Sequence, residues 1–331
     1  MPLPTASDVH VNTPLTQISI GYVQSEDAFV AGKVFPNISV QKQSDRYYTY
    51  DRGYFNRDDM EERGPASESA GTGYTVDNTP TYFCVDKALH HDIPDRVRDN
   101  ADAAVNPDRD ATLLLTQKAL IHREIKWVTA FFAGGLWTGD EDGVSGTPST
   151  DEFKQWNDAA STPIEDIRTA GTTVQESTGY RPNKLVMGRR VYDALADHPD
   201  LVDRIKYTSG NDRPSLVNRQ AMAALFEVDE VLVASAIKNT AAEKATNVHA
   251  FITGKKALLV YAAPAPGLQV PTGGYTFNWT GLKGASAGSL GIVMSKMRMD
   301  LKKADRVEIE QSFDQKLISA DLGFFFDTAV A

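Results

Sequence analysis

The segment from residue 106 to residue 133 predicts a single long helix, and this helix limits the folds open to the chain. Asn106 can cap its start, Pro107 suits its first turn, and Gly134 stops it. Apolar residues recur along it at spacings of 7, 4, 3 and 4, which predicts one buried stripe of Leu114, Ile121, Ile125, Val128 and Phe132. At 1.5 Å per residue, about 27 residues span roughly 40 Å. The rest of the chain must fold around a strut that is long for a small domain.

The residues before this helix lack a pattern that would bury them within one chain. Residues 1–44 are rich in Pro, Thr and Val without a helical period, which predicts an extended arm. Within residues 45–85, the runs DRYYTYDRGYF and TPTYFCVDK predict two strands joined by a long polar tip. A lone two-stranded excursion is marginally stable in water. We therefore expect it to pack on a partner chain.

The residues after the long helix predict a compact α/β module. TGDEDGVSGTPST predicts an acidic loop, and Thr162 with Glu165 predicts a capping box for a helix that ends at Gly179. Three strands are predicted over KLVMG, EVLVAS and KKALLVYAA, and helices over RRVYDALADH, PDLVDRIKY and SLVNRQAMAALF. The alternating runs DRVEIEQSF and LISADLGFFF predict two strands of an antiparallel sheet, paired with strands that flank the long helix.

Composition excludes several classes of protein. The 331 residues carry 34 Lys and Arg against 44 Asp and Glu, so a net charge of −10 argues against indiscriminate binding to nucleic acid. Such a protein can still enclose nucleic acid whose charge is neutralised by counterions. Cys84 is the only cysteine, so the chain can form neither an internal disulfide nor a thiolate zinc site. We expect no secretory signal and no membrane span, and therefore a protein of the cytoplasm or of something assembled there.

Candidate chemical sites are weak. His90 and His91 precede Asp92, but neighbours on a strand point to opposite faces, so a turn before Ile93 is the simpler interpretation. The stretch from Asp140 resembles a calcium loop without its required Gly and Glu, and a solvated acidic loop is favoured. The sequence contains no dinucleotide fingerprint, P-loop or nucleophile elbow. We expect no catalytic residue, metal or cofactor, and no enzyme.

Arg189 and Arg190 carry the one phosphate hypothesis. They lie between a predicted strand that ends at Gly188 and a predicted helix start, and both backbone N–H groups and guanidinium groups favour anions. No second anion-binding element accompanies them. An exposed turn of an α/β layer is therefore the favoured interpretation.

The order of the segments resembles that of major capsid proteins of tailed double-stranded DNA bacteriophages, from about residue 20 onward. The resemblance is carried by the arm, the long hairpin, the capped helix and four further stretches, namely CVDKALHHDIPDRVRDNAD, RPNKLVMGRRVYDALADHPDLVDRIKY, LFEVDEVLVASAI and ADRVEIEQSFDQKLISADLGFFF. It implies an α+β fold of the HK97-like capsid type. The implied parts are an N-terminal arm (1–44), an extended β-hairpin loop (45–85), a peripheral domain (86–159) with its spine helix (106–133), an α/β axial domain (160–295) and C-terminal strands that return to the peripheral domain (296–331).

The resemblance also implies a function. A structural, non-enzymatic protein of this kind assembles with itself, as pentamers and hexamers, into an icosahedral head shell that encloses packaged double-stranded DNA without sequence-specific binding. Its place is the virion, and assembly occurs in the host cytoplasm without a membrane. The implied partners are a portal, a decoration protein in some members, and a separate scaffolding protein, because the Pro- and Thr-rich start lacks the charged helical scaffolding segment of some members.

The implied extended loop supplies most candidates for contacts between subunits. From residue 43 to residue 86 there are four basic residues, all arginine, against nine acidic ones, and planar guanidinium groups suit the carboxylates of a neighbour. The interface candidates are Arg46, Arg52, Arg57, Asp58, Asp59, Glu61, Glu62 and Arg63, together with Arg189 and Arg190. Some members link a loop lysine covalently to a neighbour's asparagine. Because this loop has no lysine, we expect contacts that are noncovalent or reinforced by a decoration protein.

Two other functions compete with this interpretation. An encapsulin, a cellular nanocompartment with the same fold, would enclose a cargo enzyme in place of DNA. An α/β enzyme would use Arg189 and Arg190 on a phosphorylated substrate. Megadalton particles would rule out the enzyme, and the contents of the particles would separate the other two.

Overall fold

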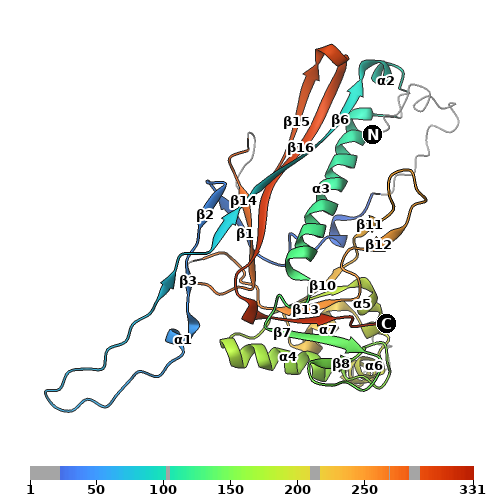
Figure 1. Cartoon of the computed structure of the whole chain (residues 1–331). Helices are drawn as coiled ribbons and strands as arrows, with labels where there is room; N and C mark the ends of the chain where they lie inside the picture. The colour runs from blue at the N-terminus through green and yellow to red at the C-terminus, as the bar shows by residue number, and fades with distance from the viewer. Residues whose placement is uncertain (1–22, 102–104, 209–216, 268, 283–290) are drawn as a thin grey trace.

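A computed structural model describes residues 23–101, 105–208, 217–267, 269–282 and 291–331. The molecule is elongated. A layered unit built on a six-stranded sheet lies at one end, a long helix and a ribbon of strands rise from it, and a thin loop projects sideways (Figure 1). Among the described residues, none of the helices combines the length and apolar character needed to span a membrane.

The six-stranded sheet has the strand order β10-β9-β13-β17-β7-β8. Its strands are β7 (Gly139–Val144), β8 (Glu152–Lys154), β9 (Lys184–Gly188), β10 (Glu230–Ala234), β13 (Ala257–Val260) and β17 (Gly323–Asp327). The helices of this unit are α4 (Pro163–Thr178), α5 (Arg189–Ala196), α6 (Pro199–Thr208) and α7 (Arg219–Phe226). β9 and β13 are apolar on both faces, as covered central strands require, and Trp156 and Phe326 are fully buried.

The second sheet is a five-stranded ribbon around β16 (Ala304–Leu317). Its other strands are β1 (Asn37–Val40), β6 (Val85–Pro94), β14 (Gly274–Trp279) and β15 (Ile292–Met299). β16 pairs antiparallel with β6, from Ala304 opposite Pro94 to Phe313 opposite Val85, and antiparallel with β14 and β15. The short elements α2 (Asp95–Asp99) and η3 (Asp300–Lys302) lie at one end of this ribbon.

The long helix is α3 (Pro107–Phe131), and it packs against this ribbon. The Asn106 side chain accepts a hydrogen bond from the Arg109 backbone N–H at 3.1 Å, which confirms the predicted cap. The predicted buried stripe is wrong in part, because Leu114 is 45% exposed. The fully packed face instead runs through Ala111, Leu115, Ala119, Arg123, Glu124, Trp127 and Phe131. Its alanines let the helix backbone approach the sheet closely.

Part of the predicted arm is built into the chain's own core. Val30, Val34 and Phe35 are buried beside Trp127 and Phe131 of α3, and β1 pairs with β14. The short helix η2 (Glu26–Ala28) precedes them. Residues 1–22 lie outside the described residues. The expectation of an arm free of the fold up to residue 44 is therefore wrong from about residue 24.

Three local expectations are also wrong. The acidic stretch expected as a loop contains strand β7, because the missing side chains of Gly139 and Gly143 leave room for Phe324 and for the Thr328 carbonyl. α4 has its predicted bounds, but the Thr162 side chain makes no capping hydrogen bond. The turn expected before Ile93 is absent, because β6 runs on through Pro94.

The two sheets divide the chain differently from the expected domain boundaries. β7 and β8, placed with the long helix, belong to the six-stranded sheet, and β14 and the start of β15, placed in the α/β module, belong to the ribbon. The two C-terminal strands also separate: β16 lies in the ribbon, whereas β17 lies between β13 and β7. The remaining pairs are β11 (Ile237–Asn239) with β12 (His249–Phe251) and the ladders of the extended loop.

Candidate assembly interfaces

The extended loop, predicted over residues 45–85, runs in the structure from the start of β2 to the end of β5, residues 44–83, and leaves the body as an incomplete hairpin. β2 (Ser44–Arg46) pairs with β5 (Thr81–Phe83), and β3 (Thr49–Tyr50) pairs with β4 (Val76–Asp77), both antiparallel. A single turn of helix, α1 (Arg52–Phe55), replaces the rest of the first predicted strand. Residues 56–75 form neither helix nor strand and are exposed apart from Asp59, which is partly buried. The loop thus has almost no core of its own.

Aromatic side chains gather on this loop without being covered. The rings of Tyr50, Phe55 and Tyr74 lie 6.0–6.2 Å apart, centre to centre. Phe55 and Tyr74 are nevertheless 57% and 63% exposed, and Met60 near the tip is 92% exposed. Exposed apolar side chains gathered in one place are typical of a surface that another molecule covers.

The base of the loop is fixed to the body. The ring of Tyr82 stacks on Phe277 of β14, with centroids 4.5 Å apart. The Phe83 backbone N–H donates to the Asp314 carboxylate at 3.0 Å. Arg52, an interface candidate, instead forms an ion pair of 2.9 Å with Asp321 of its own chain. A contact between Arg52 and a neighbour would have to compete with this pair.

The other charged candidates of the loop are exposed or make local contacts. Arg63 donates to the Ser67 carbonyl at 2.7 Å, Asp59 accepts from Thr72 at 2.7 Å, and Arg57 lies over the Tyr54 ring. The set Arg46, Asp58, Glu61 and Glu62 is exposed to solvent. These contacts hold the shape of the tip and leave most of its charge available to another molecule.

Arg189 and Arg190 lie far from the loop, at the start of α5 (Figure 1). Arg189 forms an ion pair with Asp193 one turn along its own helix at 2.8 Å, and its guanidinium lies over the Tyr192 ring. Arg190 is exposed. The structure therefore does not bring the ten interface candidates together into one surface.

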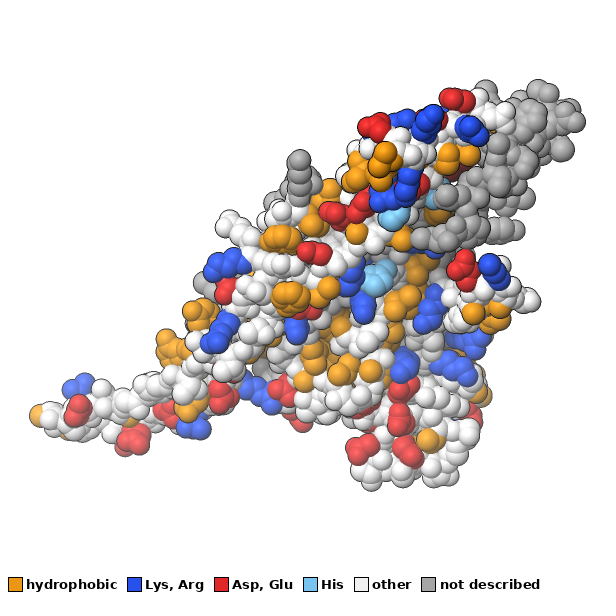
Figure 2. Space-filling model, turned by 45° about the horizontal axis from the view of Figure 1, so that its top comes forward, with side chains coloured by type: hydrophobic (Ala, Val, Ile, Leu, Met, Phe, Trp, Pro, Cys, Tyr) orange, Lys and Arg blue, Asp and Glu red, His pale blue; other side chains and the backbone are white. Residues whose placement is uncertain are grey.

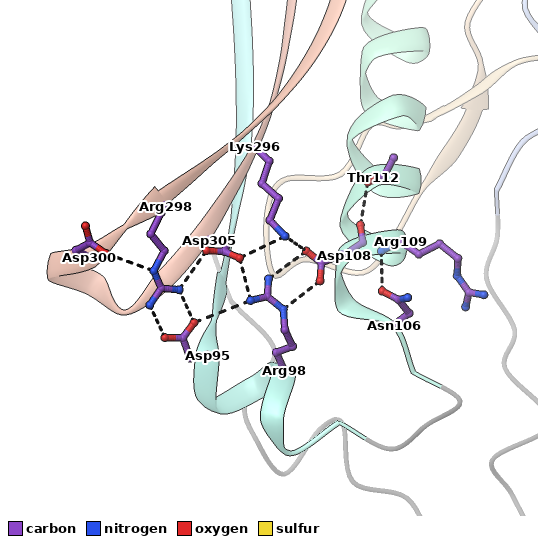
Figure 3. A network of polar contacts seen from close by, with 10 residues as sticks. All are labelled: Asp95, Arg98, Asn106, Asp108, Arg109, Thr112, Lys296, Arg298, Asp300 and Asp305. Carbon is purple, nitrogen blue, oxygen red and sulfur yellow. Dashed lines mark hydrogen bonds and ion pairs between the residues drawn. The ribbon is translucent and has the colours of Figure 1, made fainter.

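A charged cluster that the sequence analysis missed fixes the far end of the ribbon (Figure 3). Arg98 of α2 forms two hydrogen bonds of 3.0 Å with Asp108 in the first turn of α3. Arg98 also reaches Asp305 of β16 at 2.9 Å, and Lys296 of β15 contacts Asp108 at 2.9 Å. Four elements that are distant in sequence are thus joined by ion pairs.

Arg298 completes this cluster. Its guanidinium donates two hydrogen bonds of 2.6 Å to Asp95 and one of 3.1 Å to Asp305. The hydrogen bond from Arg298, followed by those from Lys296 and Arg98, lowers the pKa of Asp305 to about 2. Asp300 lies 3.5 Å from the Arg298 guanidinium. Four carboxylates thus surround the three cations Arg98, Lys296 and Arg298, and the cluster fastens the β15–β16 end to α2 and α3.

A second missed feature joins the N-terminal residues to the long helix. Glu124 is fully buried in α3, and its carboxylate accepts hydrogen bonds from the backbone N–H of Val30 at 3.1 Å and of Ala31 at 2.9 Å. Burial raises the pKa of Glu124 to about 7, despite these two hydrogen bonds. No sequence pattern indicates that a charged residue in the middle of a helix holds another segment.

Among the described residues, the structure supports neither the candidate nucleophile nor the candidate metal site. Cys84 is fully buried, and burial followed by the charge of Asp314 raises the pKa of its thiol to about 12, so it is a poor nucleophile. Asp92 pairs with Arg306 at 2.7 Å and does not join His90 or His91 in a metal site. In the part of the chain that the structure describes, no three His, Cys, Asp or Glu side chains are arranged to hold a metal ion.

Comparison with known sequences agrees with an assembling protein. The family model for phage major capsid protein E matches residues 148–274. The major capsid protein of Pseudomonas phage JBD67 is 28% identical over 327 residues, which cover 97% of each chain. The major capsid protein of Burkholderia phage BcepMu is 24% identical and covers 95% of each chain. The chain is therefore similar to phage major capsid proteins along nearly its whole length.

Several solved structures share the fold of this chain. A phage-related protein from Bordetella bronchiseptica RB50 matches with a TM-score of 0.65 and 20% identity over 92% of this chain and 94% of that one. The capsid of Cyanophage P-SCSP1u matches with a TM-score of 0.59 and 10% identity over 97% and 93%. An encapsulin from Synechococcus elongatus matches with a TM-score of 0.55 and 10% identity over 99% and 96%. The predicted HK97-like fold is confirmed, and encapsulins share it.

Proposed function

We propose that this chain is a phage major capsid protein, and that many copies of it assemble, as pentamers and hexamers, into an icosahedral head shell around packaged double-stranded DNA. The exposed extended loop is the observation that carries this proposal. Phe55, Met60 and Tyr74 are each more than half exposed in the single chain. Covering them with neighbouring copies removes apolar surface from water, which favours association.

In this proposal the parts of the chain have distinct tasks. The unit on the six-stranded sheet serves as the axial domain around the five-fold and six-fold positions, and α3 with the ribbon serves as the peripheral domain. The extended loop lies on an adjacent subunit. A portal and a separate scaffolding protein take part in assembly in the host cytoplasm, and the DNA is enclosed without sequence-specific contacts.

The loop chemistry favours noncovalent contacts between subunits. From residue 43 to residue 86 the sequence has no lysine, so the lysine-to-asparagine link of some relatives has no donor here. Arginine and carboxylate side chains on the loop instead suit ion pairs with a neighbour. A decoration protein on the outside would reinforce the shell.

Electron microscopy of particles formed by the expressed protein, with a denaturing gel of the same sample, tests this proposal. We expect closed shells of megadalton mass that dissociate to a single band near 36.2 kDa. A protein that stays a monomer at high concentration contradicts the proposed shell. A ladder of linked subunits on the denaturing gel contradicts noncovalent assembly alone.

Because encapsulins share this fold, an encapsulin-type compartment is the alternative function. Both shells use the same subunit architecture, so the contents of the particle distinguish them. Double-stranded DNA inside particles from an infected or induced host supports the capsid, whereas a co-purifying cargo enzyme supports the compartment.

A further inference from the structure

A groove with a volume of about 550 Å³ lies between α3, the paired strands β6 and β16, and β11. Figure 2 shows basic and apolar side chains intermixed on the middle of the molecule. The apolar part of the lining consists of Leu89, Ile121, Ile125 and Ile309. Gln311 also lines the groove and is only 3% exposed, yet neither atom of its side-chain amide has a hydrogen-bond partner among the described residues. A cover that supplies both apolar side chains and hydrogen-bonding groups is therefore favoured here.

The long helix α3 carries two apolar stripes, and only one of them packs on the ribbon. The first stripe, which packs on the ribbon, contains Ala111, Leu115 and Ala119. The second contains Leu114, Ile121, Ile125 and Val128, whose spacings of 7, 4 and 3 place them along one side of the helix. Leu114 is 45% exposed, and Ile121 and Ile125 line the groove. The ribbon thus leaves much of the second stripe open.

The N-terminal part of the chain already covers one end of the second stripe. Phe29 is only 6% exposed and lies in one apolar cluster with Ile125 and Val128 of α3. Ala28 belongs to the same cluster. The residues that precede Ala28 are therefore placed next to the part of the stripe that remains open.

Hydrogen bonds set the direction in which this N-terminal part runs. The Ala28 carbonyl accepts from the backbone N–H groups of Ser235 at 3.2 Å and Ala236 at 3.1 Å. Four residues earlier, the Gln24 side-chain amide donates to the Ile237 carbonyl and accepts from the Ile237 N–H, both at 2.8 Å. Going back along the N-terminal part thus leads forward along residues 235–237. The next two residues, 238–239, line the groove, so the described chain begins at the edge of the groove.

Residues 13–22, TPLTQISIGY, have a sequence that suits this groove. Ile18, Ile20 and Tyr22 alternate with polar or small residues, so an extended segment places all three on one face. Six extended residues reach roughly 20 Å at about 3.3 Å each, whereas Leu114 and Ile125 are about 17 Å apart along the helix. The segment carries no charged side chain, so it adds no like charge beside the lysines of the groove. Its backbone offers the donors and acceptors that Gln311 lacks.

We infer that residues 13–22 dock as an extended segment in the groove of their own chain, with Ile18 and Ile20 against the second apolar stripe of α3. The amines of Lys118 and Lys238 at the groove then donate to backbone carbonyls of the segment. Docking completes the cover of the long helix within each subunit, so the start of the chain is part of its own subunit's core. This inference concerns the single chain and does not rest on the proposed shell.

Cysteine cross-linking of the purified full-length protein tests this contact. The double variant Ile20→Cys with Ile121→Cys should form a disulfide within one chain, which a non-reducing denaturing gel shows as a monomer band that migrates faster than the reduced chain. Ile20→Cys with Leu113→Cys is the matched control and should stay unlinked, because Leu113 is an exposed apolar residue of α3 that does not line the groove. The native Cys84 is fully buried and stays out of the reaction.

Two results of this cross-linking would overturn the inference. If the first pair links no more than the control pair, residues 13–22 do not lie in the groove. If the first pair instead forms linked dimers or larger oligomers, the segment of a second copy occupies the groove, and docking within the same chain is wrong.

Limited digestion with chymotrypsin, which cleaves after aromatic residues, tests the same docking without cysteines. Ile18→Ser with Ile20→Ser should raise the rate of cleavage after Tyr22 by about tenfold, because cleavage follows the population of the undocked segment. Val9→Ser with Val11→Ser, which precede residues 13–22, is the matched control and should leave this rate unchanged. Mass spectrometry of the released fragment separates this cut from cuts in the extended loop. Equal cleavage rates in the wild type and the Ile18 and Ile20 variant would overturn the inference. Neither test requires shells, so a failure of the proposed function is distinguishable from a failure of this docking.

Discussion

In the unit on the six-stranded sheet, Trp156 and Phe326 are fully buried with their ring centres 5.0 Å apart, whereas on the extended loop Phe55 and Met60 are 57% and 92% exposed. Both regions are rich in large apolar side chains. One region buries them against its own chain, and the other presents them to solvent. Burying one such side chain contributes about 1.5–3 kcal/mol. The loop can gain this free energy only on contact with another molecule.

This difference separates two sources of stability in one chain. The sheet unit should be folded and stable in a single subunit that has not assembled. The loop should contribute little to that stability and much to assembly. A change in the sheet unit should therefore lower the stability of the subunit, whereas a change in the loop should mainly weaken assembly.

Trp156→Ala should have the largest effect on the subunit. Its ring packs against Phe153 and Phe326, and its Nε1 atom donates to Asp166 at 2.9 Å. Loss of a buried Trp leaves a cavity and costs about 3–5 kcal/mol. Chemical denaturation of the unassembled subunit measures the loss. Met60→Ala, on the exposed tip, is the control and should stay within about 0.5 kcal/mol. Equal effects would remove the distinction between the two regions.

Glu124 lies between these extremes, because it joins residues 30–31 to the long helix. Glu124→Ala would leave two buried backbone N–H groups unpaired, at a cost of about 1–3 kcal/mol. Glu124→Gln keeps an oxygen acceptor and should be milder. The free energies of unfolding of the two variants, each compared with the wild type at one pH, test whether Glu124→Ala is the more destabilising change. A larger loss for the Gln variant would show that the negative charge, and not the acceptor, holds the N-terminal residues.

The Gln variant should also change the pH dependence of stability. The pKa of Glu124 is raised from 4.5 to about 7 in the folded chain, so the folded state binds its proton more readily than the unfolded state. The stabilising contribution is therefore fully present below about pH 4.5 and is lost as the pH rises through about 7. Between pH 5 and pH 8, the free energy of unfolding should fall more steeply with rising pH for the wild type than for Glu124→Gln. Parallel curves would assign the slope to other groups.

Local patterns predicted the sheet unit better than the ribbon. KLVMG and EVLVAS are short apolar runs bounded by turns, and they form β9 and β10 where expected. The partners of DRVEIEQSF and LISADLGFFF depend on contacts that are distant in sequence, so the alternation predicted two strands without indicating that they enter different sheets. Gly139 and Gly143 appear as loop residues in sequence, although their function is close packing within a strand.

The candidate interfaces were likewise predictable only where they depend on local sequence patterns. The loop was recognisable because its residues lack a buried pattern, and its exposure is visible in the structure. The predicted apolar stripe on the long helix was wrong in part for two reasons. Counting only large apolar residues overlooked Ala111 and Ala119, which are buried. Ile121 and Ile125, which were counted, line a groove. The contacts of Glu124 and the charged cluster each depend on residues brought together by tertiary structure, which no spacing in the sequence records.

Phe55→Ala should have the smallest effect on the subunit and a clear effect on assembly. Its ring lies 6.2 Å from Tyr50 and 6.1 Å from Tyr74, but it is 57% exposed, so removing it leaves no buried cavity. Unfolding should therefore change by less than about 0.5 kcal/mol. The critical concentration for shell formation should rise by about tenfold, because an interface aromatic is commonly worth more than 1 kcal/mol. Val202→Ala, an apolar truncation at an exposed site on α6, is the matched control and should change neither quantity. If Phe55→Ala instead destabilised the subunit as strongly as Trp156→Ala, the loop would belong to the core of its own chain, and assembly would have to draw its free energy from another surface.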